Sequence, residues 1–383
     1  MSHVATFFIH PLTLLAIALV PVVLSARAGS LRKFIVFNIV TILLFVALFD
    51  VVAAVFFMTD ERLFRRDHPV YHHGLKPYED RMTRWRLGEP YRVVTNSLGM
   101  LDREPREVPL KPAGRRIVIA GDSFIEGVGF SYEKTIPGII ADRLSPQGTE
   151  VLDAGTVSFS PKLYYLRFRY LLEQGLSFND LYLFIDIGDI QDEVLYAYFA
   201  PDPHPAPAFV ETAYLFCYQR SFLFRSLWDH FVIRAENPRS EFSDYWRGLD
   251  EHYRVRPMWT YDEKEFDRWG REGLASAIDH TDKLWRLLKE SGISLHLSVH
   301  PWREQIARGE LDTRQQRVWR EFCADRGIEF IDLFPLFIND TPTKEVFDAY
   351  FIPDDIHWNE EGLRMVAEEL LERIGKKSAG TMK

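Results

Sequence analysis

Hydrophobic residues follow two different patterns along the 383-residue chain. Near the N-terminus they form two continuous runs, residues 11–25 and 34–58, and the second contains a single acid, Asp50. From residue 115 onward, short apolar runs alternate with amphipathic stretches. A helix rises 1.5 Å per residue, so the second run is long enough to cross a bilayer. The pattern predicts a membrane-embedded N-terminal part followed by a globular domain.

The two N-terminal runs predict a transmembrane helical hairpin over residues 1–58. A cleaved signal peptide fits the first run poorly, because no basic segment precedes it. The loop 26–33 carries three basic residues and no acid, which places it in the cytoplasm by the positive-inside rule. The following domain would then be periplasmic, at a bacterial inner membrane. Three arginines within residues 62–66 favour the opposite orientation, so the orientation stays open.

The alternation after residue 115 predicts the fold of the globular part. Five short apolar runs predict strands at residues 117–120, 150–153, 181–187, 294–299 and 328–333. Amphipathic stretches predict helices at residues 133–144, 161–174, 274–289, 314–325 and 359–374. Strands that alternate with helices form parallel sheets covered on both faces. We therefore expect a three-layer α/β/α, flavodoxin-like, doubly wound sheet over residues 114–383.

Two segments depart from this alternation. Residues 59–113 are polar and weakly periodic, and they predict a neck that contains an edge strand at 91–100. Residues 193–270 are rich in aromatic side chains and predict an insertion beside the sheet.

Charge and cysteine content exclude several classes of function. The net charge is −9, so the basic surface of a nucleic-acid-binding protein is absent. Cys217 and Cys323 are the only cysteines, and no Cys/His cluster suggests a metal. We expect neither a metal nor another cofactor. Whether the two cysteines form a disulfide or remain free thiols is left open by the sequence.

Candidate catalytic residues follow the first strand and precede the last helix. In an open α/β sheet, active sites gather at the carboxyl ends of the strands. Ser123, in the sequence Gly-Asp-Ser-Phe, sits on a strand-to-helix turn whose backbone N–H groups can stabilise an oxyanion. His357, in Asp-Asp-Ile-His, is a suitable general base. Either motif alone would be an ordinary turn or an acidic helix start. Together at one sheet edge they favour catalysis.

These motifs resemble those of the SGNH (GDSL-like) serine hydrolase superfamily over roughly residues 115–376. The segments that carry the resemblance are GDSF (121–124), Gly155, GDIQD (188–192) and DDIHWNEEG (354–362). The resemblance implies that Ser123 is the nucleophile and His357 its base. It also implies that Asp354 orients His357, because the family's Asp lies three residues before its His; the adjacent Asp355 is the rival. Gly155 matches the glycine whose N–H joins the oxyanion hole.

The third motif departs from the family pattern. Family members usually have Gly-x-Asn-Asp, in which the Asn side chain donates an oxyanion hydrogen bond, and here Gly188 or Asp189 stands in that place. Gly188 would offer only its backbone N–H, an ionised Asp189 would repel the oxyanion, and Gln191 is a substitute donor. Losing one donor costs roughly 10²–10³-fold in rate. We count Asp189, Gln191 and His300 as candidate substrate contacts.

The resemblance implies an ester-handling enzyme at a bacterial membrane. An acyl group, such as acetyl, would pass from a small ester or acylated glycan to Ser123. It would pass from there to water or to a hydroxyl of an envelope or exported glycan. Expected partners are the lipid bilayer and, by analogy with membrane-tethered relatives, a polytopic membrane acyltransferase. The alternative is a catalytically degenerate fold that binds glycan or acts as a scaffold. Lipid-directed hydrolysis, which predicts a deep apolar cleft, is a third reading.

Overall fold

The chain folds into two compact units, which are described separately. The computed structural model describes residues 30–57, 64–85, 88–201, 217, 221–228 and 255–381. One unit comprises Met1–Leu63 with Asp202–Pro238, and the other Phe64–Pro201 with Arg239–Lys383. The first predicted membrane run, residues 11–25, lies outside the described residues.

The smaller unit contains helix α3 (Ser30–Phe57), which covers the second apolar run, and the short helix α9 (Phe222–Trp228). The buried Asp50 of α3 accepts hydrogen bonds from Leu223 N at 2.7 Å and Ser221 Oγ at 2.5 Å. Its carboxylate therefore satisfies polar groups at the start of α9. Among the helices of the described ranges, none has the length and apolarity needed to cross a membrane. The predicted two-span hairpin is thus unconfirmed.

A five-stranded parallel sheet forms the centre of the larger unit. Its strands lie in the order β6-β5-β7-β8-β9, with every neighbouring pair parallel. The strands are β5 (Arg115–Ala120), β6 (Thr149–Asp153), β7 (Asp180–Ile185), β8 (Ser294–Val299) and β9 (Glu329–Asp332). Each of the five predicted strands is present, and the doubly wound order is confirmed. Because all strands are parallel, their carboxyl ends meet at one edge.

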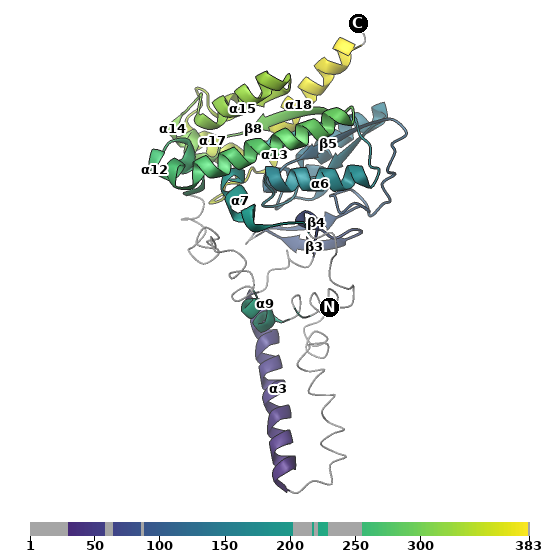
Figure 1. The fold of residues 1–383 in the computed structure, drawn as a ribbon, viewed down its shortest axis with the longest axis vertical. Helices are drawn as coiled ribbons and strands as arrows, with labels where there is room; N and C mark the ends of the chain where they lie inside the picture. The colour runs from purple at the N-terminus through teal and green to yellow at the C-terminus, as the bar shows by residue number, and fades with distance from the viewer. Residues whose placement is uncertain are drawn as a thin grey trace. The chain divides into compact units, whose positions relative to one another are not determined.

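Helices cover both faces of this sheet. The chain runs from β5 outward to β6 and then back past β5 to β7, so right-handed crossovers put the intervening helices on opposite faces. On one face, α6 (Pro161–Glu173) packs along α13 (Arg271–Glu290), as Figure 1 shows. On the other, α5 (Ile136–Leu144) packs on α18 (Glu360–Thr381). The three-layer α/β/α prediction is confirmed.

A fifth predicted helix, α15 (Arg314–Arg326), lies beside α13. The two helices are joined by Arg326 Nε, which donates to Asp282 Oδ1 at 2.7 Å. The remaining helical elements of this unit are short: α4 (Ser123–Glu126), η2 (Tyr132–Lys134), η3 (Ser145–Gln147), α7 (Asp189–Leu195), η4 (Tyr196–Tyr198), η7 (Arg256–Thr260), α12 (Glu263–Glu265), η8 (Phe266–Gly270), α14 (Arg303–Arg308), α16 (Phe334–Phe337) and α17 (Thr343–Tyr350). Of the predicted insertion, 193–270, the structure describes the two ends and a few residues between them.

The predicted neck, residues 59–113, is divided at Phe64, and from there on it belongs to the same compact unit as the sheet. It folds as two antiparallel hairpins. Strand β1 (Arg65–His68) pairs with β2 (His72–Leu75), and β3 (Asp80–Arg84) pairs with β4 (Pro90–Val94). The predicted strand at 91–100 is therefore present in part, as β4.

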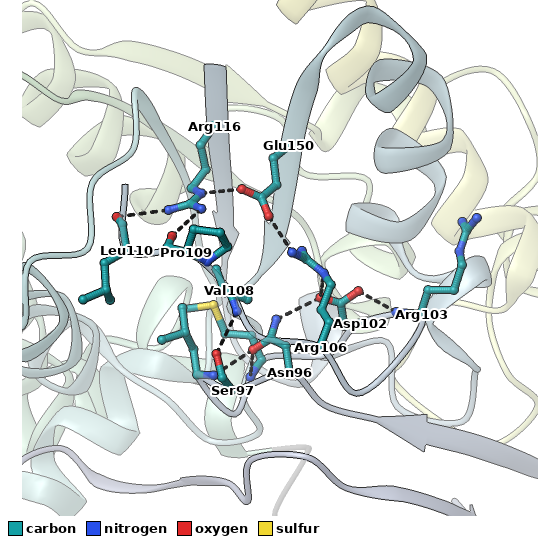
Figure 2. A network of polar contacts seen from close by, with 12 residues as sticks. Asn96, Ser97, Asp102, Arg103, Arg106, Val108, Pro109, Leu110, Arg116 and Glu150 are labelled. Atoms are coloured by element: carbon teal, nitrogen blue, oxygen red, sulfur yellow. Dashed lines mark hydrogen bonds and ion pairs between the residues drawn. The ribbon is translucent and has the colours of Figure 1, made fainter. Parts of the chain in front are cut away.

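Arg116 ties the end of this segment to the amino edge of the sheet, as Figure 2 shows. Its guanidinium is buried and donates to Glu150 Oε2 at 2.7 Å. It also donates to the carbonyl oxygens of Pro109, Leu110 and Ser177 at 2.7, 3.4 and 3.0 Å. A buried charge is tolerated only when it is paired and hydrogen-bonded in this way. Arg116 is therefore a buried polar anchor between the end of the hairpin segment and the sheet.

Replacing Arg116 with Ala should lower the free energy of unfolding by about 3 kcal/mol or more. The change removes the donor to the carbonyls of Pro109 and Ser177. Leu110 O keeps its bond from Ser177 N, and Glu150 keeps its ion pair with Arg106. Urea unfolding followed by tryptophan fluorescence measures it. Arg103→Ala is the control, because Arg103 pairs with Asp142 on the surface and should change stability by less than about 1 kcal/mol. Equal effects of the two substitutions would refute the anchor.

Candidate active site

Ser123 begins α4 directly after β5, at the carboxyl edge of the sheet. The turn needs glycine at position 121, because a Cβ there would lie 2.4 Å from Ile125 Cγ1. Asp122 caps the helix by accepting from Phe124 N at 3.0 Å. The Ser123 hydroxyl is consequently held at the first turn of the helix, and the residue is 8% exposed.

His357 lies within hydrogen-bond reach of this serine. Its Nε2 is 2.8 Å from Ser123 Oγ, although the two residues are 234 positions apart in the sequence. Its Nδ1 is 2.6 Å from Asp355 Oδ1. The ring packs against Phe124 at a centroid distance of 4.9 Å. The sequence prediction that Ser123 and His357 act together agrees with this geometry.

The prediction that Asp354 orients His357 is wrong, because Asp355 occupies that position. Asp354 has φ +55°, a left-handed turn, and is exposed. Asp355 is buried, and its Oδ1 accepts from both His357 N at 3.1 Å and His357 Nδ1. An Asp side chain readily bonds a backbone N–H two residues on, and here that turn also brings the carboxylate to the imidazole.

Trp85, from the hairpin segment, holds the other oxygen of this carboxylate. Its Nε1 donates to Asp355 Oδ2 at 2.9 Å, and its ring meets His357 edge-on at 5.3 Å. Arg303 Nη1 donates to the Asp355 carbonyl at 3.1 Å. Sequence reasoning missed Trp85, since it lies in the predicted neck and belongs to none of the motifs. The acid of the relay is thus fixed from three directions.

Two predicted oxyanion donors are already engaged by carboxylates. Gly155 N donates to Asp153 Oδ1 at 2.9 Å, and Gly188 N donates to Asp186 Oδ1 at 2.5 Å. The assignment of both amides to the oxyanion hole is therefore wrong for this structure. Glycine at 155 has a packing reason, because a Cβ there would lie 2.2 Å from Glu126 N.

The loop after β6 brings another amide to the site. Thr156 N donates to Gly121 O at 2.9 Å, and Val157 N donates to Glu126 Oε2 at 2.9 Å, so the loop is bonded on both sides of the nucleophile turn. The next residue, Ser158, has φ +58° and is partly exposed. Within the described ranges, the N–H groups of Ser123 and Ser158 have no acceptor. These two N–H groups are therefore candidate oxyanion donors.

His73 fixes the peptide that carries the Ser158 N–H. Its Nε2 lies 2.8 Å from Val157 O, and its Nδ1 lies 2.8 Å from His72 Nδ1. If Nε2 donates to the carbonyl, Nδ1 must accept from His72. In a trans peptide the N–H points opposite to the C=O, so the Ser158 N–H faces away from His73.

The three candidate substrate contacts lie below the surface, and we correct that prediction. Asp189 and His300 are fully buried, and Gln191 is 3% exposed. His300 Nε2 lies 3.1 Å from Asp186 Oδ2, and Trp302 Nε1 donates to the same oxygen at 2.5 Å. His300 is therefore a support for Asp186, since a residue with no exposed surface cannot touch a substrate in this conformation.

Three buried carboxylates gather beneath the nucleophile: Asp122, Asp186 and Asp189 have oxygens within 4.8 Å of one another. Burial, and then the charge of Asp186, hold the pKa of Asp122 well above its usual range. Burial and the neighbouring carboxylates do the same to the pKa of Asp189. Burial alone would raise the pKa of Asp186, but its contacts with His300, Trp302 and Gly188 N lower it. Asp186 is thus the ionised member of the cluster.

Comparison with known proteins gives only distant structural similarity. No protein-family model and no curated protein matches the chain. Solved structures similar to it include a putative acylhydrolase, a GDSL-like lipase and an acetyl xylan esterase.

Three solved structures illustrate these neighbours. A putative acylhydrolase from Bacteroides fragilis has 14% identity and a TM-score of 0.36, covering 71% of this chain and 92% of its own. A GDSL-like lipase from Bacteroides thetaiotaomicron has 12% identity and a TM-score of 0.34, covering 68% and 89%. A variant of an acetyl xylan esterase from Geobacillus stearothermophilus has 13% identity and a TM-score of 0.37, covering 70% and 97%. At these values we take the chemistry of the site from its own residues.

Asp355→Asn should lower kcat for hydrolysis of an activated ester by about 10³–10⁴-fold, because the amide no longer fixes the imidazole tautomer. Asp354→Asn is the matched control and should change kcat less than threefold, since Asn tolerates the left-handed conformation. Spectrophotometric p-nitrophenyl acetate assays compare the two variants with the wild type. A larger loss in Asp354→Asn would restore the assignment made from the sequence.

His73→Gln should make stability less sensitive to acid. Burial lowers the pKa of His73 to about 4, although its hydrogen bond to Val157 raises it. The unfolded chain, with an ordinary His pKa near 6.5, binds more protons below that pH, so stability present above about 6.5 is lost as the pH falls toward 4. One proton gives a slope of up to about 1.4 kcal/mol per pH unit. Urea unfolding at several pH values tests this, and identical slopes in wild type and variant would contradict it.

Proposed function

We propose that this protein cleaves carboxylic esters through an acyl-Ser123 intermediate. The observation that carries the proposal is the continuous relay from Ser123 Oγ to His357 Nε2 at 2.8 Å and from His357 Nδ1 to Asp355 Oδ1 at 2.6 Å. Nucleophile, base and orienting acid within such distances are the signature of an activated serine. The alternative of a catalytically degenerate scaffold gives no reason for this relay to be intact.

The relay assigns each proton in the reaction. Asp355 keeps the His357 proton on Nδ1, so Nε2 can accept the proton of Ser123 Oγ as that oxygen bonds to the acyl carbon. The ester carbonyl oxygen becomes an oxyanion, and we assign its stabilisation to the N–H groups of Ser123 and Ser158. Collapse breaks the bond to the alkoxide, which takes the proton from Nε2. A water molecule then repeats the sequence on the acyl-enzyme and releases the acid.

We extend the proposal to O-acyl transfer, in which a glycan hydroxyl replaces water in the second half. Hydrolysis and transfer share the acyl-enzyme and differ only in the molecule that attacks it. The support is the resemblance to membrane-tethered SGNH proteins, and the glycan acceptor and a polytopic acyltransferase partner rest on that resemblance alone.

A membrane location is also proposed from the sequence, at a bacterial inner membrane with the catalytic unit on the periplasmic side. Helix α3 exposes many large apolar side chains, among them Phe34, Phe37, Phe45 and Phe49, each more than 60% exposed. An apolar surface of this kind is typical of contact with lipid or with another apolar partner.

A fluorophosphonate probe should label wild-type protein at Ser123, because the activated hydroxyl attacks phosphorus as it attacks an acyl carbon. Ser123→Ala should lose both labelling and p-nitrophenyl acetate hydrolysis, with rates at least 10³-fold lower. Ser145→Ala, at an exposed position, is the control that keeps both. A folded wild-type protein that the probe fails to label would rule out the acyl-serine mechanism.

A further inference from the structure

In one of the two registers that the resemblance allows, Gly188 stands where SGNH hydrolases carry their oxyanion-hole Asn, and the space for a side chain there is already filled. A Cβ built on Gly188 would lie 2.9 Å from Arg256 Nε and 3.0 Å from Arg256 Cζ. It would also lie 2.8 Å from Asp186 Oδ1. The φ of Gly188 is −73°, so backbone conformation is no reason for glycine. The space is occupied by the Asp186 carboxylate and by the Arg256 guanidinium, and the latter comes from a distant part of the chain.

Arg256 is fixed in this place by several contacts. Its Nη2 donates to Gly188 O at 2.9 Å and forms an ion pair with Asp192. The same turn, η7, is fastened to the end of β7 by Trp259, whose Nε1 donates to Ile187 O at 2.9 Å. Arg256 is 8% exposed and Trp259 is fully buried. The guanidinium is therefore held as rigidly as a side chain of residue 188 itself would be.

The site around Ser123 is close to this guanidinium. Strands β5 and β7 are neighbours, with Ala120 opposite Leu183, so the turns that follow them lie side by side. The carboxylate of Asp122 reaches from the Ser123 turn to within 4.8 Å of those of Asp186 and Asp189. Asp122 Oδ2 also lies 3.3 Å from Ser123 Oγ. The charge of Arg256 acts on this cluster: it lowers the pKa of Asp122 against the effect of burial, and Asp186 and Asp189 in turn raise the pKa of Arg256.

The charge balance of the cluster suits this position. Neighbouring carboxylates, Asp192 first, outweigh burial and raise the pKa of Arg256, so its charge is permanent. Burial, followed by the neighbouring carboxylates, raises the pKa of Asp189 well above its usual range, so this carboxyl binds a proton more readily than an ordinary Asp. The repulsion that an ionised Asp189 would exert on an oxyanion is thereby reduced. A fixed cation next to the nucleophile turn remains.

We propose that the Arg256 guanidinium is the third oxyanion donor of this protein and replaces the Asn side chain that Gly188 lacks. This inference rests on the proposed ester chemistry and adds a catalytic residue to it. The oxyanion would then face the N–H groups of Ser123 and Ser158 and one N–H of Arg256. A charged donor strengthens the hydrogen bond relative to a neutral amide. Residue 188 must then be glycine, because a Cβ at this position would overlap the Arg256 guanidinium.

A set of four variants of the full-length chain tests the replacement: Arg256→Gln, Arg256→Ala, Gly188→Asn and the double variant Arg256→Ala/Gly188→Asn. Arg256→Gln should lower kcat for p-nitrophenyl acetate by about 10²–10³-fold, with KM changed less than threefold. The double variant should be at least tenfold faster than Arg256→Ala, because the family's Asn then fills the vacated space. Gly188→Asn alone should be slower than wild type, since its side chain collides with Arg256. Arg320→Gln, which removes an exposed ion pair with Asp312, is the control without effect.

A second reaction probes the same oxyanion site, and urea unfolding checks that each variant is folded. Inactivation by paraoxon passes through a pentacoordinate phosphorus whose phosphoryl oxygen gains negative charge, so its rate should fall and recover in parallel with kcat across the four variants. Arg256→Gln with kcat within threefold of wild type would overturn the proposal. So would a loss in the Arg256 variants that Gly188→Asn fails to restore. If the proposed ester chemistry itself is wrong, the result differs: the wild-type protein is then neither labelled by fluorophosphonate nor active on p-nitrophenyl acetate.

Discussion

The candidate site depends on one repeated interaction, in which an Asp carboxylate accepts the backbone N–H two residues further on. It occurs after β5, β6, β7 and β9 and again before α18. The pairs are Asp122 with Phe124 N (3.0 Å), Asp153 with Gly155 N (2.9 Å), Asp186 with Gly188 N (2.5 Å), Asp332 with Phe334 N (3.0 Å) and Asp355 with His357 N (3.1 Å). Each bond turns the chain at or near the carboxyl edge. Four of these bonds shape the turns that carry Ser123, the Ser158 loop, Gly188 and His357.

The same interaction decides which amides remain for chemistry. An N–H that satisfies a buried carboxylate is unavailable to an oxyanion, so the glycine amides at 155 and 188 serve the turns. The amides of Ser123 and Ser158 carry no such bond among the described residues. At the position of the third oxyanion donor, the Arg256 side chain of the predicted insertion lies where a side chain of residue 188 would begin. The glycine amides therefore stabilise the turns, whereas the proposed third oxyanion donor comes from a distant part of the chain.

Much of this was predictable from the sequence, and the exceptions have a common cause. The period of the apolar residues gave all five strands and the order of layers, because burial on both faces of a parallel sheet leaves an unmistakable pattern. Ser123 and His357 followed from short motifs at strand and helix ends. Asp355, Ser158, Trp85 and Arg256 did not. Their roles depend on the direction of a turn or on contacts between residues more than sixty positions apart. The local period of apolar residues predicts neither of these properties.

Trp85 carries a consequence for how the catalytic unit can be isolated. The sheet, the nucleophile and the histidine all lie after residue 114, so a fragment starting there would contain the whole Ser–His–Asp set. It would lack the indole that binds Asp355 Oδ2 and the His73 ring that holds Val157 O. Such a fragment would also expose the surface that Arg116 covers with residues 109 and 110. A fragment that keeps these contacts must therefore begin near Phe64, because the hairpins before the sheet hold Asp355 and the Val157 carbonyl in place.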